Sequence, residues 1–231
     1  MRSNRPTLAL RFAYALALVA MFVICYGGTN WLTSFRSDVG QLYFGWELKH
    51  IPLIPAMIVP YMSVDLLFLA AFFVCRDLPE MKVLARRLAT ALIVGAMCFL
   101  ICPLRIGFER PQVDGFFGPI FSLLHGLDNP FNLAPSMHVT IAIILAAMYV
   151  LKVKNRILRF VVAGWFVLIC VSTLFTWQHH IIDVISGAAL GWACLGVVPD
   201  RLQSVRKYLA PASAAEGRSD SSTGSSVIES L

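Results

Sequence analysis

Charged side chains are scarce in this sequence. Asp, Glu, Lys and Arg make up 14% of its 231 residues, whereas a soluble globular domain has about 25%. Hydrophobic residues make up 58%, and the mean hydropathy is +0.73. That is more apolar surface than a soluble core of this length can bury. The composition excludes an ordinary soluble domain and predicts a membrane protein.

Cysteine pairs with the spacing of metal ligands are also missing. The six cysteines lie in apolar runs or at their ends and include no CxxC pair. We interpret them as small apolar residues between packed helices. No internal repeat is apparent, which argues against a transporter built from inverted repeats.

Six apolar runs have, or nearly have, the length that a helix needs to cross a membrane. They cover residues 8–27, 54–75, 88–104, 136–151, 157–176 and 180–198. The sequence therefore predicts an all-α, polytopic bundle of six helices, with residues 1–198 as one membrane domain. The first run is expected to stay attached as an anchor. Residues 199–231 are rich in Ser, Ala and Gly, which predicts a largely disordered cytoplasmic tail.

The net charge of +6 follows the order of the runs. Basic residues cluster before the first run, between the second and third, between the fourth and fifth, and after the sixth. By the positive-inside rule, both termini are cytoplasmic and the alternate loops face outward. This distribution argues against a nucleic-acid partner. Short loops and a compact size favour a multi-pass protein of a bacterial inner membrane.

Histidines gather on the outward side of this topology. They are His50, His125, His138, His179 and His180. In "QHHIIDV", His179 and Asp183 are four apart, so a helix puts them on one face and the carboxylate can orient the imidazole. His180 points about 100° away. Gly187 and Gly191 follow on the face of His179 and permit close packing with a neighbouring helix.

Two further outward segments carry polar groups. In "NLAPSMHVT", Pro135 suits the first turn of a helix and Ser136 its start. Free N–H groups there would bind an anion, and His138 would be placed to give a proton to a departing oxygen. In "RIGFERPQ", Arg105 and Arg110 offer guanidinium groups for phosphate oxygens. Together the three segments supply what phosphoryl transfer requires.

The three segments resemble the signature motifs of the type 2 phosphatidic acid phosphatase superfamily, which contains membrane lipid phosphatases and lipid phosphotransferases. The family pattern is Lys-x6-Arg-Pro, then Pro-Ser-Gly-His, then Ser-Arg-x5-His-x3-Asp. The "RP" at 110–111 matches the end of the first motif, and "PSMH" at 135–138 matches the second with Met for Gly. Ser172, His179 and Asp183 match the third.

The resemblance implies a membrane lipid phosphatase that hydrolyses a phosphate monoester or diphosphate of a lipid at the outer membrane face. It implies that His179 forms a phosphohistidine, Asp183 orients it, and His138 protonates the leaving group. Arg110 and Ser136 would hold the phosphate. The resemblance implies neither a metal nor another cofactor, and the expected partners are a phosphorylated lipid and the bilayer.

Two positions depart from the family pattern. Pro103 stands where the first motif has Lys, so Arg105 is expected to substitute from a different offset. Thr173 replaces the Arg of the third motif. With "PSMH" and "HHIID", the pattern is nearest to the branch of inositol phosphorylceramide synthases. That branch implies an alternative function, the transfer of a phospho-headgroup to a lipid alcohol acceptor.

A different class of function stays open from the residues alone. The group His138, His179, His180 and Asp183 is also suited to a zinc site or a proton relay in a transporter. Asp65 lies inside the second run, where a carboxylate costs a few kcal/mol. We expect it to face the bundle interior, with an interhelical hydrogen bond favoured over a role toward substrate.

Overall fold

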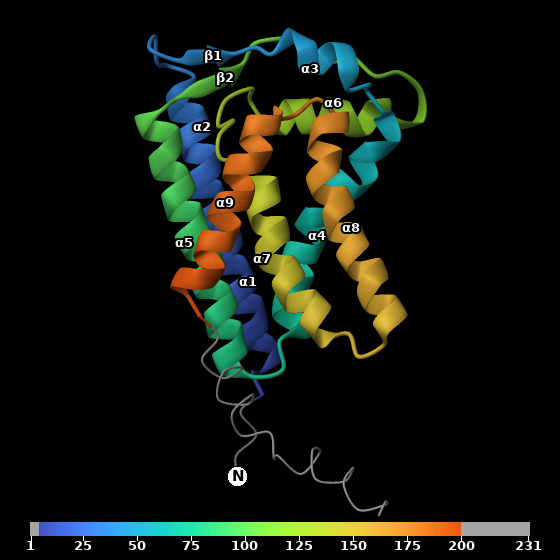
Figure 1. Cartoon of the computed structure of the whole chain (residues 1–231). Coiled ribbons are helices and arrows are strands. Elements are labelled where there is room, and N and C mark those ends of the chain that lie inside the picture. The colour runs from blue at the N-terminus through green and yellow to red at the C-terminus, as the bar shows by residue number, and fades with distance from the viewer. Residues whose placement is uncertain (1–4, 200–231) are drawn as a thin grey trace, which may run out of the picture. The chain divides into compact units, whose positions relative to one another are not determined.

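The computed structural model describes residues 5–199, which form a mostly helical bundle (Figure 1). The α-helices are α1 (Leu8–Phe22), α2 (Gly28–Thr33), α3 (Gly45–His50), α4 (Ile58–Val74), α5 (Leu78–Ile101), α6 (Gly118–Leu127), α7 (Met137–Lys152), α8 (Arg156–Phe175) and α9 (Ile181–Val197). The shorter elements are the π-helix η1 (Val23–Gly27), the 3-10 helices η2 (Pro55–Met57) and η3 (Gly115–Phe117), and the strands β1 (Gly40–Leu42) and β2 (Leu104–Ile106). The expected tail lies outside the described residues, apart from Pro199.

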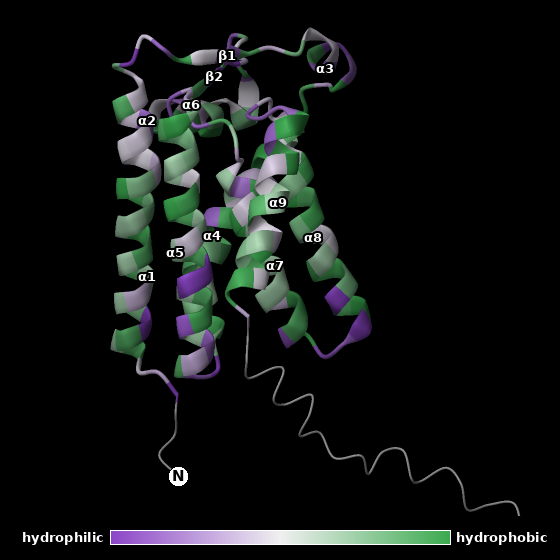
Figure 2. Ribbon diagram, turned by 60° about the vertical axis from the view of Figure 1, so that its left-hand side comes forward, coloured by the Kyte–Doolittle hydropathy of each residue, from purple (hydrophilic) through white to green (hydrophobic). Residues whose placement is uncertain are grey.

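Four helical segments are long and apolar enough to cross a membrane. They are Leu8–Thr33, Pro55–Val74, Leu78–Ile101 and Arg156–Phe175. Helices α7 and α9 are apolar but have only 16 and 17 residues. Figure 2 shows that hydrophobic residues dominate the middle of the helices. These features indicate a multi-pass membrane protein, while the count of six spans stays a prediction.

Helix caps explain where two helices begin. The third span was expected from residue 88, but α5 begins at Leu78 because the Asp77 side chain accepts a hydrogen bond from the Glu80 N–H. The helix therefore extends into a charged segment that apolar periodicity does not mark. Ser136 is the N-cap of α7. Pro135 accordingly precedes the cap, and the expectation that it occupies the first turn is corrected.

Two short strands correct the expectation of an all-α fold. β1 and β2 pair in parallel, with Gly40 opposite Leu104, and the Gly40 N–H donates to the Pro103 carbonyl at 2.9 Å. The strands come from the connections that follow α2 and α5, and both are extended segments whose backbone groups need partners. Helix α6 lies within the connection between α5 and α7. Figure 1 shows these elements and α3 together at one end of the bundle, which we call the loop end.

Helix α7 occupies the centre of the bundle. It packs against α4, α5, α8 and α9. Residues 139–142 are buried in succession, so all sides of the helix are covered. The contact with α9 is close because Gly187 and Gly191 have no side chain: a Cβ on Gly187 would lie 2.5 Å from the Ser136 carbonyl oxygen. The glycine pair thus lets α9 approach α7, in line with the sequence pattern.

Candidate active site

The starts of α7 and α9 meet at the loop end of the bundle. The Ser136 N–H donates to the Asp183 carbonyl at 3.0 Å. One turn along each helix, the Thr140 hydroxyl donates to the Gly187 carbonyl at 2.9 Å. Because these bonds join the two helices directly, the "PSMH" and "HHIID" segments are held side by side.

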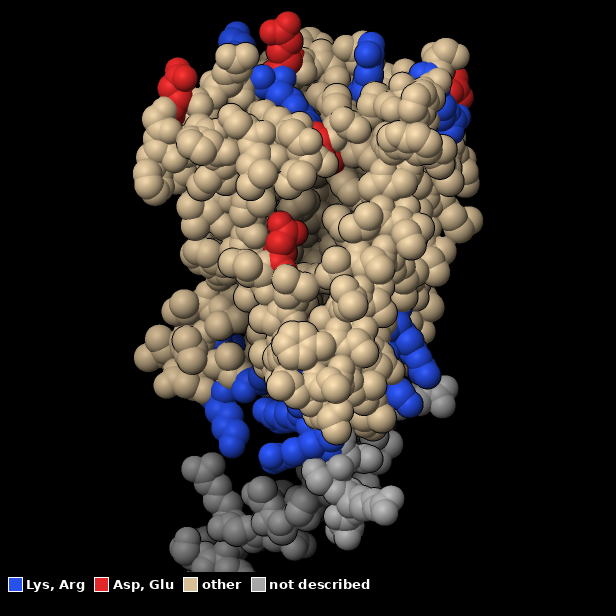
Figure 3. Space-filling model, turned by 180° about the vertical axis from the view of Figure 1, so that it is seen from behind, with Lys and Arg blue, Asp and Glu red and all other residues tan. Residues whose placement is uncertain are grey.

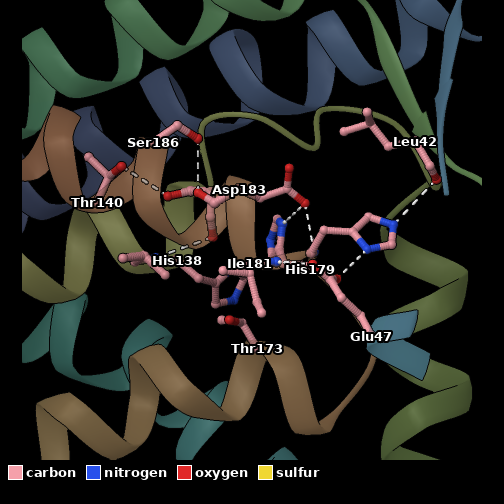
Figure 4. Close-up of polar contacts among 12 residues, drawn as sticks. Leu42, Glu47, His138, Thr140, Thr173, His179, Ile181, Asp183 and Ser186 are labelled. Carbon is pink, nitrogen blue, oxygen red and sulfur yellow. Dashed lines mark hydrogen bonds and ion pairs between the residues drawn. The ribbon is translucent and has the colours of Figure 1, made fainter. Parts of the chain in front are cut away.

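His179 lies next to Asp183, but it precedes α9, so the expectation that a helix puts the two residues on one face is corrected. Its Nδ1 lies 3.5 Å from Asp183 Oδ2, and the carboxylate is completely buried (Figure 4). The same oxygen accepts the His180 N–H at 2.8 Å, which fixes the carboxylate at the start of α9. The Thr173 carbonyl accepts the His179 N–H at 3.2 Å and so holds the preceding turn. The Nε2 atom of His179 has no hydrogen-bond partner among residues 5–199 and is free to react.

His138 faces the same space from the first turn of α7. Its ring centroid lies 6.5 Å from that of His179. The ring stacks on Tyr61 of α4 with centroids 4.1 Å apart, and the Tyr61 hydroxyl lies 3.4 Å from Nδ1. Nε2 of His138 is buried and has no hydrogen-bond partner in the described part of the chain. Tyr61 therefore orients the imidazole and leaves one nitrogen for a ligand.

Arg110 is held by the loop that precedes α7. Its guanidinium group donates to the Asp128 carbonyl, to the Asn129 carbonyl at 3.2 Å, and toward the Asp128 carboxylate at 3.5 Å. Its Nε is buried without a partner among the described residues. The Asp128 carboxylate in turn accepts from the Tyr26 hydroxyl at 3.1 Å and from the Asn30 amide at 2.8 Å. Burial raises the pKa of the Asp128 carboxyl, and Arg110 opposes that rise.

The other two expected phosphate ligands differ in position. Ser136 is fully buried, and its hydroxyl accepts from the Val139 N–H at 3.5 Å, as an N-cap does. Arg105 is exposed on β2, and its side chain makes no hydrogen bond or ion pair within residues 5–199. The structure brings Ser136 to the junction of α7 and α9 and leaves Arg105 on the surface, so the phosphate role of Arg105 stays a prediction.

His180 turns away from the other histidines. Its Nδ1 lies 2.7 Å from the Glu47 carboxylate of α3, and its Nε2 lies 3.3 Å from the Leu42 carbonyl (Figure 4). Both His180 and Glu47 are buried. The Glu47 carboxylate also accepts the Ile181 N–H at 3.3 Å. This pair fastens the segment between α2 and α4 to the start of α9, so His180 is positioned for anchoring.

The remaining histidines lie in different settings. His50 is exposed, with Nδ1 2.7 Å from the Trp46 carbonyl. His125 of α6 receives a contact from the Gln178 amide at 3.3 Å. Burial, and secondarily Arg110, lowers the pKa of His125, so its ring is neutral at pH 7. Among residues 5–199, no group of three or more His, Cys, Asp or Glu side chains has an arrangement that could hold a metal ion.

Three residues of this site escaped sequence reasoning. Tyr61 reads as one more apolar residue of a span, and Glu47 sits in an aromatic outer segment. Asp128 lies in a loop sequence, "LDNPF", that is typical of a turn. Only Asp128 had a detectable signal, an acidic side chain within the same outward connection as Arg110.

Comparison with known proteins supports the interpretation of the motifs. Residues 114–197 match the family model of the PAP2 superfamily. No curated protein matches the chain. The matched segment runs from η3 to the end of α9 and contains His138, His179 and Asp183, whereas Arg110 precedes it. Residues 114–197 are thus similar to the PAP2 superfamily.

Proposed function

We propose that this protein is a membrane lipid phosphatase that works through a phosphohistidine at His179. One observation carries the proposal: the imidazoles of His138 and His179 lie 6.5 Å apart between ring centroids. At this separation both rings can contact the same phosphoryl group.

In the first step, Nε2 of His179 attacks phosphorus and the bond from phosphorus to the lipid oxygen breaks. Asp183 Oδ2 lies 3.5 Å from Nδ1 of His179, so it favours the proton on Nδ1, leaves Nε2 unprotonated and stabilises the positive charge that the ring acquires. His138 in its protonated form gives a proton from Nε2 to the departing lipid alcohol. The products of this step are the alcohol and the phosphohistidine.

In the second step, water attacks the phosphohistidine. His138, now neutral, takes a proton from the water, and the bond from phosphorus to His179 breaks to release phosphate. Arg110 supports both steps, because its unpartnered Nε and its anchored guanidinium group are suited to the charge on the phosphoryl oxygens. Ser136 supports the same role through the N–H groups at the start of α7.

The orientation in the membrane follows from charge. Figure 3 shows Lys and Arg gathered at one end of the face in view, whereas the loop end carries residues of both signs. We propose six spans, with both termini in the cytoplasm and the loop end facing outward, by the positive-inside rule. The active site would then act on lipids of the outer leaflet.

Transfer to a lipid alcohol is the second candidate. It is favoured by an apolar cavity that borders His138 between α1, α4 and α7. A lipid alcohol in that cavity would reach the phosphohistidine in place of water, with His138 as its base. Attack of an alcohol on the phosphohistidine is the reverse of the first step. The accepting alcohol therefore binds beside His138, in the position that the leaving alcohol occupied. No observation favours the transporter with a histidine metal site, since His180 pairs with Glu47.

A radiolabelled lipid phosphate panel tests this function. Purified protein is incubated with each lipid, with and without a long-chain alcohol, and both free phosphate and new phospholipid are measured. We expect phosphate release without an acceptor and an acid-labile protein label that is absent in His179→Ala. If new phospholipid forms with the alcohol and no phosphate is released without it, the protein is a transferase and the phosphatase proposal fails. Label that persists in His179→Ala would overturn the proposed nucleophile.

A further inference from the structure

An apolar cavity of about 230 Å³ opens next to the candidate active site. Its walls come from α1, α4 and α7 and include Phe22, Val64, Phe68 and Met137, with His138 at its border. These helices are apolar at this depth, so the cavity lies among the membrane-spanning segments. Figure 3 shows a hollow in the uncharged middle of the molecule with one acidic side chain beside it.

Among the described residues that line this cavity, Asp65 is the only charged one. It lies in the second turn of α4 and is exposed, so the expectation that it faces the bundle interior is corrected, and its side chain makes no hydrogen bond or ion pair with any residue from 5 to 199. The interhelical hydrogen bond that was expected for Asp65 is therefore not formed within this part of the chain. A carboxyl group inside a span is costly and normally faces a partner or a functional cavity. The exposed carboxyl group of Asp65 is thus open to a ligand from outside the described residues.

The spacing along α4 relates Asp65 to the reaction centre. Tyr61 stacks on His138, and Asp65 follows Tyr61 by four residues on the same face of the helix. One helical turn is about 5.4 Å, so Asp65 lies roughly 6 Å deeper along the helix than the residue that holds His138. Suppose that the phosphorylated oxygen of a lipid lies at His138 and that its chain enters the cavity. The part of the chain that lies beside Asp65 is then a few carbons from that oxygen.

We propose that this cavity binds the chain of the reacting lipid and that Asp65 accepts a hydrogen bond from a hydroxyl or amide N–H of that chain. The preferred substrates are then phosphorylated lipids with a hydrogen-bond donor a few carbons from the phosphorylated oxygen. This inference rests on the proposed function, because it assumes that a lipid phosphate reacts at His138. It goes further by assigning a specificity residue within the span.

The test uses two synthetic lipids that differ in one group. The first is hexadecyl phosphate, and the second is hexadecyl phosphate with a hydroxyl on its fifth carbon. Phosphate release from each is measured for the wild type, Asp65→Asn, Asp65→Leu and the control Leu66→Ala. Leu66 is the neighbouring residue on α4, is 72% exposed and does not line the cavity. Elution as a single peak in size-exclusion chromatography checks that each variant is folded.

We expect the wild type and Leu66→Ala to prefer the hydroxylated lipid by about tenfold or more in kcat/KM, the scale of a hydrogen bond to a charged group. Asp65→Asn keeps an acceptor oxygen and should retain part of the preference. Asp65→Leu should lose the preference, so that its kcat/KM values for the two lipids become equal. An equal loss for both lipids would indicate a structural role for Asp65 and would overturn the inference.

A binding measurement separates this inference from the proposed function. His179→Ala protein, with and without Asp65→Leu, is titrated with each of the two lipids. Tighter binding of the hydroxylated lipid that depends on Asp65 supports the inference even if the wild type releases no phosphate, in which case only the proposed function fails. Equal affinity for the two lipids in His179→Ala protein would refute the inference whatever the catalytic result.

Discussion

The backbone N–H of Ser136 donates a hydrogen bond to the carbonyl oxygen of Asp183 at 3.0 Å. The two residues are far apart in the sequence: Ser136 caps α7, and Asp183 lies in the first turn of α9. The bond joins the cap of α7 to the first turn of α9. It follows that the geometry of the active site depends on how closely these two helices approach.

Replacement of Gly187 by Ala should separate the two helices. A Cβ at this position would lie 2.5 Å from the Ser136 carbonyl oxygen, so the backbone must shift. We expect a loss of about 1–3 kcal/mol in stability, as for other overpacked sites, and at least a tenfold loss of kcat. Both are measured by thermal unfolding in detergent and by phosphate release. Gly196→Ala on the same helix is the matched control, because nothing lies within 4 Å of its added Cβ.

His179→Ala should abolish turnover in a protein that remains folded and inserted. Loss of a covalent nucleophile normally lowers kcat by several orders of magnitude. His50→Ala is the control, because His50 is exposed and contacts only the Trp46 carbonyl among the described residues. Phosphate release above about a tenth of the wild-type rate in His179→Ala would count against the nucleophile assignment.

Arg110→Lys should weaken the enzyme although it keeps the charge. Arg110 uses several donors to bind the carbonyls of Asp128 and Asn129 and still has Nε left over. A lysine ammonium cannot fill these positions at once. We expect about a hundredfold loss in kcat/KM and weaker inhibition by inorganic phosphate. An unchanged inhibition constant for phosphate would show that Arg110 does not contact the phosphoryl group.

Glu47→Ala should weaken the attachment of the segment between α2 and α4 to the start of α9. The substitution leaves the buried imidazole of His180 and the Ile181 N–H without their partner. An unsatisfied buried polar group costs about 1–3 kcal/mol, which should appear as a lower unfolding midpoint. Glu109→Ala removes an exposed acid of an outer connection and serves as the control. Equal midpoints for the two variants would argue against an anchoring role for the pair.

The helices were predictable to the extent that apolar runs mark them. Helices α7 and α9 lie within a residue or two of their runs, whereas α5 begins ten residues before its run because Asp77 caps a charged first turn. Strands β1 and β2 were not foreseen. Each has three residues and no alternation of its own, and each exists only because the other lies beside it.

The sequence by itself determined the membrane character and the chemical groups of the site. The apolar composition and the short separation of His179 and Asp183 in the sequence are local properties of the chain. The tertiary structure alone decided the partners of these groups: Tyr61 for His138, Asp128 for Arg110 and Glu47 for His180. The physical reason is that these contacts depend on which helices pack together, and an apolar run in the sequence does not specify its packing partner.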